Sequence, residues 1–534
     1  HVRSRRQRQM CIRDRAATVP LRVLFIALLM LSGCTNQVPI VPSQALPAAD
    51  SSFGAALQKR AAEHQGHSGF RLLPASNEAF AARAELIRAA QHSLDLQYYI
   101  VHDGLSTRAL IKELLQAADR GVRVRILLDD TTSDGEDYQI ALLAAHPNIE
   151  IRVFNPLHLG RLNGVTRVIG RGLNLSQQHR RMHNKLWLAD SAAAIVGGRN
   201  LGDEYFDAEP NMNFTDIDML SVGPIARDLA ESFDQYWNSR LSKPIEEFVW
   251  REPSQKDLDK ARKGLRDYLD TARVEQPELY ERLLAYQHDP KLKVWLDELI
   301  WAPGVALWDA PSKVLASGKP DPHLLLTTQL APHLKAAKRD LVMVSAYFVP
   351  APAGLQFLIG LADDGVDIRL LTNALEATDV PAVHGGYAPY RQEMLEHGMR
   401  LFELRSQPGA DSPPAYSFSG SSNSSLHSKA IVIDKQKSFV GSFNVDPRSV
   451  LWNTEVGVLV DSPQLAAYLR ELALQGMKPS VSYEVRLQPD GNGSRMVWIG
   501  EDDGQAFVLT EEPGNRWRRF NAWFARAIGL EKML

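Results

Sequence analysis

Hydrophobic and polar positions follow two different periods along the first half of the chain. Positions that recur every three to four residues are typical of amphipathic helices, and short continuous apolar runs are typical of buried strands. These patterns predict a helix over 78–91, a strand over 94–101, a helix over 108–119 and a strand over 122–129. Strands that alternate with helices in this way indicate an α/β lobe.

The second half of the chain repeats this order of elements. The patterns there predict a strand over 341–349, a helix over 354–363 and a strand over 366–373. Two α/β lobes in one chain favour a pseudo-two-fold assembly, equivalent to an isologous dimer fused into one polypeptide. We therefore expect two mixed β-sheets flanked by helices, with a functional site at the interface of the lobes.

Composition divides the chain into six predicted segments. They are a leader and export signal over 1–33, a Pro/Ala/Ser-rich tether over 34–53, a first lobe over 54–243, a charged helical insertion without strand signals over 244–316, a second lobe over 317–479, and a hairpin with an amphipathic helix over 480–534. Within the leader, residues 1–15 read as an artefactual translation and are excluded from the fold. Residues 408–425 are rich in Ser, Gly and Pro, and we expect a mobile loop there.

One set of chemically specific residues occurs in each lobe at identical spacing. The first copy consists of His183, Lys185, Asp190, Gly197, Gly198 and Asn200. The second copy, 244 residues later, consists of His427, Lys429, Asp434, Gly441, Ser442 and Asn444. The flanks repeat too, since Gly121 lies 62 residues before His183 and Gly365 lies 62 residues before His427. The repetition indicates one site built from two halves.

These residue types suit displacement at a phosphodiester. A neutral histidine can attack phosphorus while a protonated one donates a proton to the leaving alcohol. The lysines and asparagines would stabilise negative charge on the non-bridging oxygens, which makes a metal unnecessary. If each His-x-Lys segment is a strand, its His and Lys point to the same face. Asp190 and Asp434 are better explained as structural residues that close the turn after each strand.

Each attacking or donating imidazole needs a carboxylate to orient its other nitrogen. Glu455 follows the second motif, and Asp216 occupies the corresponding place after the first. Asp218 shares the strand face with Asp216 and stays an alternative. We expect the pairing to be crossed, with Glu455 serving His183.

The double H-x-K-x4-D-x6-G-[G/S] signature resembles that of the phospholipase D superfamily. Longer segments, such as Leu96–Tyr99 and Gly441–Ser449, are similar to those of bacterial cardiolipin synthases. The resemblance implies two phospholipase D-like lobes, a phosphohistidine intermediate and no metal or other cofactor. It also implies that His183 is the nucleophile and His427 the acid/base.

The resemblance further implies a phosphatidyltransferase that acts on phosphatidylglycerol, with phosphatidylethanolamine as a second donor and an accessory protein as a partner. A hydrolase that uses water, on phospholipids or on nucleic acid, is the alternative, and a non-catalytic envelope scaffold is a third. Residues 34–534 carry 53 Lys and Arg against 62 Asp and Glu, and such an acidic body disfavours nucleic acid.

The chain has two cysteines, and both lie in the first 34 residues. Cys34 ends a basic, apolar and small-residue series that is typical of an export signal. The apolar run is too short to span a bilayer. The Leu-Ser-Gly-Cys ending resembles a bacterial lipobox, which predicts a cell-envelope protein anchored to the membrane by a lipid at Cys34. A plain signal peptide is the alternative.

Several further residues have two interpretations. Tyr98, Tyr99 and His102 are expected to pack in the core. The segments Thr378–Asp379 and Val383–Tyr387, with Arg391, would either line a head-group pocket or form a structural loop, and His179–Arg181 would either attract anionic lipid or lie in solvent. The last predicted helix bears Trp517, Phe520 and Phe524 beside four arginines. It would either lie in a membrane interface or cap the domain.

Overall fold

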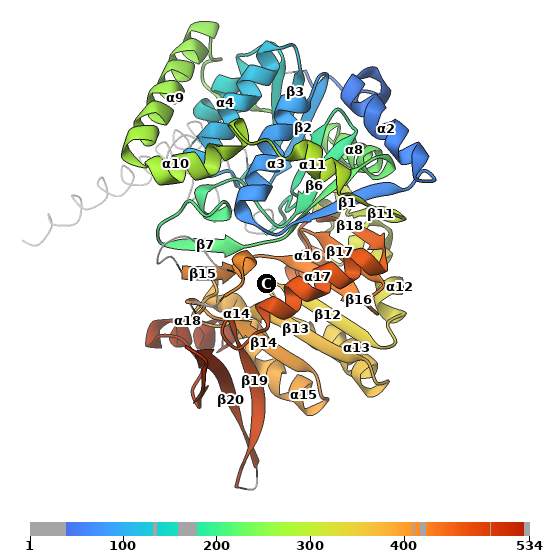
Figure 1. Cartoon of the computed structure of the whole chain (residues 1–534), viewed down its shortest axis with the longest axis vertical. Coiled ribbons are helices and arrows are strands. Elements are labelled where there is room, and N and C mark those ends of the chain that lie inside the picture. Colours follow the sequence, from blue (N-terminus) through green and yellow to red (C-terminus); the bar gives the residue numbers. More distant parts are fainter. Residues whose placement is uncertain are drawn as a thin grey trace, which may run out of the picture.

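The computed structural model describes residues 39–131, 136–157, 179–409, 412–416, 423–491 and 493–527. Two sheets with helices on their faces lie one above the other, with the early part of the chain in one lobe and the late part in the other (Figure 1). The predicted fold class, two α/β lobes with a mixed sheet each, is confirmed.

The first sheet has nine strands among the described residues. Its order is β10 (Ile300–Ala302), β1 (Ser68–Leu73), β8 (Asp218–Val222), β6 (Ala193–Gly197), β5 (Leu186–Ala189), β2 (Ser93–Tyr98), β3 (Arg123–Asp129), β4 (Ile149–Phe154) and β9 (Ser242–Pro244). The neighbours β2, β3 and β4 are parallel, and the other pairs are antiparallel.

The second sheet repeats this order and extends it. Its described strands are β11 (Gly304–Trp308), β18 (Val456–Asp461), β17 (Lys437–Gly441), β16 (Lys429–Ile433), β12 (Asp340–Ser345), β13 (Asp367–Asn373), β14 (Arg400–Leu404), β19 (Ser482–Asp490), β20 (Gly493–Asp502) and β21 (Gln505–Leu509). Counted along each sheet, the eight strands that run from β1 across to β9 correspond one to one with the eight that run from β11 across to β19. The sequence repeat is therefore a structural repeat.

Helices cover both faces of each sheet. The outer helices of the first lobe are α3 (Ser76–Ala89), α4 (Leu105–Asp119) and α5 (Asp137–Ala144), and those of the second are α12 (Leu326–Lys335), α13 (Ala351–Asp363) and α15 (Arg391–Glu396). Between the sheets lie α8 (Pro224–Trp237) and α17 (Pro463–Gly476), whose apolar sides join one central core with strands of both lobes. Because both faces of each sheet are covered, the strands read as continuous apolar runs.

The two repeated glycines have one conformational role. Gly121 ends α4 with φ +94°, and Gly365 ends α13 with φ +90°. A left-handed residue after a helix C-terminus turns the chain back, and glycine adopts it at little cost. Each turn returns the chain to the strand that follows, β3 or β13.

The predicted helical insertion over 244–316 is only partly helical. It contains α9 (Gln255–Glu275), α10 (Pro277–Leu284) and α11 (Leu292–Asp297), but also two strands, β10 and β11. Strand β10 pairs with β1, and β11 pairs with β18 as the first strand of the second sheet. The expectation of no strands was wrong, because runs of three and five residues are too short for their periodicity to identify them.

The predicted tether is docked over its described part. From residue 39 onward it lies against the first lobe, followed by α2 (Ser52–Glu63). The backbone N–H of Ala45 donates to Asp234 (2.7 Å), and Arg125 and Arg152 donate to the carbonyls of Ser43 and Val41. Flexibility inferred from composition was therefore wrong for residues 39–53, because three buried or half-buried polar groups of the lobe take this segment as their partner.

The end of the predicted loop over 408–425 is also ordered. Strand β15 (Asn423–Leu426) pairs in parallel with β7 (Met212–Thr215) of the first lobe. Figure 1 shows these two strands side by side at the boundary between the lobes. They lead directly into His427 and Asp216.

Candidate functional site

The two motif histidines lie just before the strands that were predicted to contain them. Strand β5 begins at Leu186, after His183 and Lys185, and β16 begins at Lys429, after His427. The prediction of complete His-x-Lys strands was therefore wrong at the N-terminal end. The histidines leave their own sheets because their backbones bond to the opposite lobe.

That backbone pairing is reciprocal. The N–H of His183 donates to the carbonyl of Thr454 (2.9 Å), and the N–H of His427 donates to the carbonyl of Thr215 (2.8 Å). Each threonine directly precedes a carboxylate residue, Glu455 or Asp216. The same exchange between lobes therefore positions a histidine and a carboxylate together.

The side chains complete two crossed pairs. His183 Nδ1 lies 2.9 Å from Glu455 Oε2, and His427 Nδ1 lies 2.8 Å from Asp216 Oδ2. Both histidines and both acids are buried. With Nδ1 engaged by a carboxylate, Nε2 is the nitrogen left for chemistry on each ring.

The alternative acid, Asp218, has a different set of partners. Its carboxylate lies 2.9 Å from Arg83 and 3.4 Å from Arg199 within the core of the first lobe. The motif glycines make room for the acids: a Cβ on Gly197 would lie 2.0 Å from Asp218 Oδ1, and one on Gly198 would lie 2.4 Å from Asp216 Oδ1. Gly441 likewise lies against the backbone of Val456, 2.4 Å from where a Cβ would be.

Three residues around Glu455 hold it in place. The hydroxyls of Ser442 and Ser449 donate to its carboxylate, and Asp309 accepts its backbone N–H (2.8 Å). Ser442 occupies the position of Gly198 in the repeat. Ser449 and Asp309 were not anticipated, because neither belongs to the motif and Asp309 lies in the segment interpreted as an insertion.

The lysines and asparagines converge on the same place. Lys185 Nζ donates to the carbonyl of His183 (2.7 Å), and Lys429 Nζ donates to that of His427. The side-chain oxygens of Asn200 and Asn444 accept from the backbone N–H groups of Ile100 and Tyr347 (3.3 and 3.4 Å). These bonds place the amide groups at equivalent positions in the two lobes.

The histidines and asparagines line one pocket of about 240 Å³ between the lobes. Tyr99, Tyr205 and Tyr347 also line it, and the ring of Tyr99 lies 5.0 Å from that of His183. The expectation of core packing was right for Tyr98, which is buried, but wrong for Tyr99, because successive strand residues face opposite sides. His102 is at the surface beside Glu204.

Charge is distributed unevenly over this pocket. Arg448 and both lysines lower the pKa of His183, after burial, which is the largest cause. Burial and the lysines also lower the pKa of His427, but Asp379 opposes them. Asp379 accepts a hydrogen bond from the Tyr347 hydroxyl (2.7 Å) at the pocket wall. Besides Asp216, His427 therefore has a second carboxylate neighbour, Asp379, that favours its protonated form.

The two motif aspartates lie away from the pocket. Asp190 accepts backbone N–H bonds from Gln91, His92 and Ser93, and Asp434 accepts them from Lys338, Arg339 and Asp340. Both aspartates have positive φ values, +50° and +53°. Each carboxylate holds the start of the neighbouring strand, β2 or β12.

The 378–391 region divides between the two expected roles. Asp379, Val380 and Val383 line the pocket, whereas His384 and Arg391 are buried against Glu512 (2.8 and 2.7 Å). The predicted pocket role was therefore wrong for His384 and Arg391, whose side chains contact Glu512 and connect α14 (Pro381–Tyr387) and α15 with the C-terminal segment.

The basic triplet before the first motif is not a solvated loop. Arg181 is buried and pairs with Asp129 (3.4 Å), and Arg180 lies over the ring of Trp452 (4.9 Å). Both guanidinium groups are therefore engaged with neighbouring residues of the protein.

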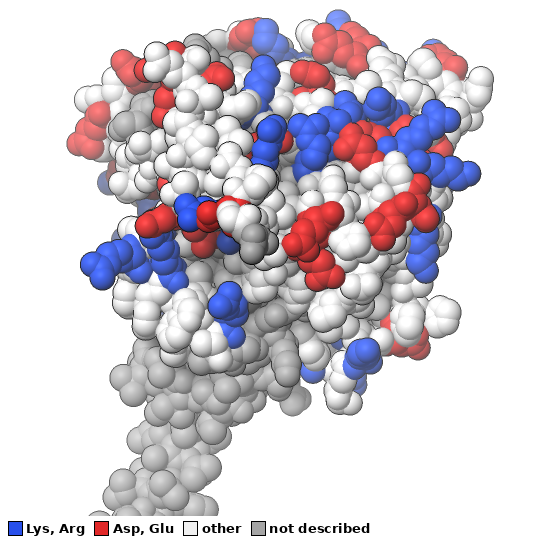
Figure 2. Space-filling model, turned by 90° about the horizontal axis from the view of Figure 1, so that it is seen from below, with Lys and Arg blue, Asp and Glu red and all other residues white. Residues whose placement is uncertain are grey.

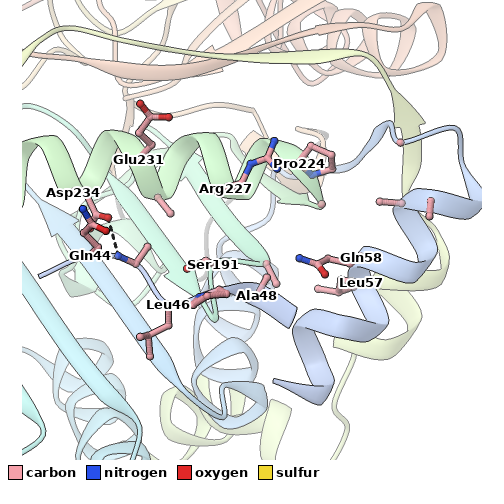
Figure 3. Close-up of a pocket in the computed structure, with 18 of the residues that line it drawn as sticks. Gln44, Leu46, Ala48, Leu57, Gln58, Ser191, Pro224, Arg227, Glu231 and Asp234 are labelled. Carbon is pink, nitrogen blue, oxygen red and sulfur yellow. Dashed lines mark hydrogen bonds between the residues drawn. The ribbon is translucent and has the colours of Figure 1, made fainter. Parts of the chain in front are cut away.

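A larger pocket, of about 890 Å³, lies between the 44–48 segment, α2 and α8 (Figure 3). Its walls are mainly alanine, leucine and proline side chains, with Arg227, Glu231 and Asp234 on α8. It contains none of the motif residues and no histidine, so it offers no group for phosphodiester chemistry. The smaller pocket between the lobes is the candidate active site.

Comparison with known proteins matches this architecture. The family model described as "Cardiolipin synthase, PLD-like domain" matches residues 84–237 and 330–475, one stretch in each lobe. Cardiolipin synthase C of Escherichia coli is 35% identical over 477 residues, which cover 88% of this chain and 97% of that protein. Cardiolipin synthase A of Pseudomonas fluorescens is 25% identical, over 80% of this chain and 72% of that protein.

Among solved structures, phosphatidylserine synthase of Haemophilus influenzae superposes with a TM-score of 0.53 over 89% of this chain and all of that chain. At 14% identity this likeness shows the fold alone. The family model that matches both lobes and the 35% identity to a relative covered almost completely show that the chain belongs to the cardiolipin synthase family of phospholipase D-like proteins.

Proposed function

We propose that this protein is a phosphatidyltransferase that moves a phosphatidyl group from one phospholipid to the hydroxyl of another through a phosphohistidine intermediate. The observation that carries the proposal is the pair of crossed His–carboxylate contacts on one pocket, His183 with Glu455 and His427 with Asp216. Two oriented imidazoles are what a two-step displacement requires.

In the first step, Nε2 of His183 attacks phosphorus. Burial and nearby cations keep this ring neutral, which is the nucleophilic form. The bond from phosphorus to the head-group oxygen breaks, and His427 donates its proton to that oxygen. Asp379 near His427 supports the assignment of the acid to this ring.

In the second step, the acceptor hydroxyl gives its proton to His427, and its oxygen attacks phosphorus. The phosphorus–nitrogen bond breaks and His183 is released as the neutral ring. Lys185 and Lys429, with Asn200 and Asn444, would hold the non-bridging oxygens, because ammonium and amide N–H groups stabilise the added negative charge. We propose phosphatidylglycerol as the acceptor and cardiolipin as the product, with phosphatidylglycerol or phosphatidylethanolamine as donor; an accessory protein stays part of the proposal.

The test is lipid mass spectrometry of cells that lack their own cardiolipin synthases and express this chain. Cardiolipin should appear with the wild-type chain. Phosphatidic acid without cardiolipin would identify a hydrolase instead, and unchanged lipids in both the producing cells and a purified assay with mixed phospholipids would contradict the proposal.

The pH dependence of the reaction should be bell-shaped. Burial raises the pKa of Glu455 to about 7, so kcat/KM should rise as this carboxylate ionises and becomes the acceptor for His183. Burial lowers the pKa of Lys429 to about 8, so the rate should fall as this ammonium loses its proton. Initial rates measured between pH 5 and pH 10 check this. The rate should change on the order of tenfold per pH unit on each limb.

Two variants separate the limbs of that profile. Glu455→Gln should move the acidic limb down to the titration of Asp216, because burial raises the pKa of that carboxylate to about 6. Lys429→Arg should move the basic limb upward, because a guanidinium keeps its proton. A basic limb that stays in place in Lys429→Arg would contradict its assignment.

Nucleic acid is the less favoured substrate. Figure 2 shows Lys and Arg side chains interspersed with Asp and Glu on the face drawn, rather than one continuous basic field. A backbone-binding nuclease relies on such a field. Cleavage of labelled DNA in the presence of EDTA would favour the nuclease alternative.

We also propose that the protein is anchored to the cell envelope by a lipid at Cys34, which lies outside the described residues. Among those residues there is no helix long and apolar enough to cross a membrane. Incorporation of labelled palmitate that is unchanged by Cys34→Ser would exclude the anchor.

A further inference from the structure

We propose that the exposed face of the last described helix, α18 (Arg516–Ala527), binds the surface of a bilayer that contains anionic phospholipids. The helix has four arginines and no acidic residue. The sequence pattern left a membrane role and a packing role open. The proposal goes further because the structure packs one side of the helix on the second lobe and leaves the other side exposed.

One side of α18 is docked on the second lobe. Ala522 and Ala525 are buried, and a Cβ on Gly385 of α14 would lie 2.3 Å from the carbonyl oxygen of Ala522. Arg518 donates to the carbonyls of Leu375 (3.2 Å) and Thr378 (2.6 Å). This close contact fixes the rotation of the helix about its axis, and Figure 1 shows α18 beside α14.

The other side carries a continuous aromatic patch. Trp517 is 68% exposed, Trp523 55%, and Phe520 and Phe524 48% each. The centroid of the Phe520 ring lies 5.7 to 6.1 Å from those of Trp517, Trp523 and Phe524. Four of the twelve exposed large hydrophobic side chains in the described part of the chain are therefore gathered within eight residues.

The charges beside this patch point to an anionic bilayer. Arg516 and Arg526 are exposed at the two ends of the helix, and Trp and Phe with arginine are the combination that lies in the head-group region. The acidic body, with nine more acidic than basic groups over 34–534, would be repelled by an anionic surface elsewhere. A second copy of this chain would cover the aromatic rings but would bring like-charged arginines together.

The docked side of α18 contacts the segment that forms one wall of the candidate active site. Arg518 holds the carbonyl of Thr378, and the next residue, Asp379, lines the pocket, as does Val383 at the base of α14. Seated on a bilayer, α18 would bring the wall of the pocket to the lipid surface. This last step rests on the proposed function, whereas bilayer binding itself does not.

A fluorophore on α18 tests the contact between this helix and the bilayer directly, independently of the proposed lipid anchor at Cys34. The full chain with Cys11→Ala, Cys34→Ser and His183→Ala receives Trp523→Cys, labelled with an environment-sensitive dye. Vesicles of phosphatidylcholine with phosphatidylglycerol should shift its emission to the blue. The matched control is Trp250→Cys in the same background, since Trp250 is 85% exposed on the first lobe, and it should not shift.

Charge and aromatic variants separate the two contributions. Arg516→Gln and Arg526→Gln should each weaken the dye response to phosphatidylglycerol vesicles about fivefold, with no change on phosphatidylcholine alone. In the active enzyme, Trp517→Ala with Phe524→Ala should lower turnover of vesicle lipid at least tenfold and leave hydrolysis of a soluble nitrophenyl phosphodiester unchanged. A blue shift that needs no vesicles and rises with protein concentration would overturn the proposal in favour of self-association, as would vesicle binding without a shift at position 523. A vesicle-dependent blue shift at position 523, together with a chain that keeps His183 but turns over no phospholipid, would refute the proposed function alone.

Discussion

Replacing His183 by alanine should abolish both cardiolipin and phosphatidic acid formation, with a loss of turnover of about 10⁴-fold or more. The ring nitrogen of His183 is the one protein atom that bonds to phosphorus in the proposed mechanism. No neighbouring side chain can replace it, because the lysines beside it are buried and bonded to backbone carbonyls. His427→Ala should be as severe with natural lipids, since an unprotonated alkoxide is a poor leaving group.

A substrate with a nitrophenol leaving group separates the two histidines. Nitrophenolate departs without an acid, so His427→Ala should release about one equivalent of nitrophenol per site and then stop, with the phosphatidyl group trapped on His183. His183→Ala should give no burst. A burst in His183→Ala but not in His427→Ala would reverse the two roles.

The control for both variants is His397→Ala. His397 also pairs with a carboxylate, Asp363 (2.8 Å), but lies on the surface of the second lobe away from the pocket. Its turnover should equal that of the wild type. A comparable loss in His397→Ala would indicate that the histidine variants act through folding.

Replacing Glu455 by glutamine should lower turnover by about 10² to 10⁴-fold, and Asp216→Asn should do the same. Each carboxylate accepts a hydrogen bond from Nδ1–H of its histidine and stabilises positive charge on that ring. An amide of the same shape can offer its N–H instead, which favours the tautomer with the proton on Nε2. That tautomer cannot attack phosphorus through His183.

Non-additivity distinguishes this positioning role from a general structural one. The double variant His183→Ala with Glu455→Gln should be no slower than His183→Ala alone, because the carboxylate acts only through the ring. Asp363→Asn, which removes the partner of His397, is the matched control. Multiplying losses in the double variant would show that Glu455 acts independently of His183.

Local sequence patterns were enough to predict much of the fold and of the candidate site. The two motif copies, the α/β alternation and the glycines at 121 and 365 are local patterns, and they led to two lobes with one shared site. Asp216 was identified as the counterpart of Glu455, because Thr215–Asp216 and Thr454–Glu455 align in the repeat, and crossed pairing was also expected. These inferences needed only residue type and spacing.

Several features could not be read in this way because they depend on contacts far apart in the sequence. Strands β10 and β11 are too short to show a period, and they exist because exposed edges of β1 and β18 pair with them. Asp309 supports Glu455 from 146 residues away, and the described tether residues are ordered by Arg125 and Arg152 of the first sheet. The composition of a segment does not identify the distant residues that pair with it.

The sequence by itself determined the reacting groups: two histidines, two lysines, two asparagines and the acids that follow them, in duplicate. The tertiary structure alone decided that Asp216 rather than Asp218 orients His427, which tyrosine faces the pocket and which side of α18 is exposed. The spacing of residues in the sequence reveals the period of a strand or helix. A pocket forms where segments from two lobes meet, and the sequence contains no direct measure of the distance between residues of different lobes. The asymmetry between Arg448 and Asp379, which distinguishes the two otherwise equivalent histidines, arises at that meeting point.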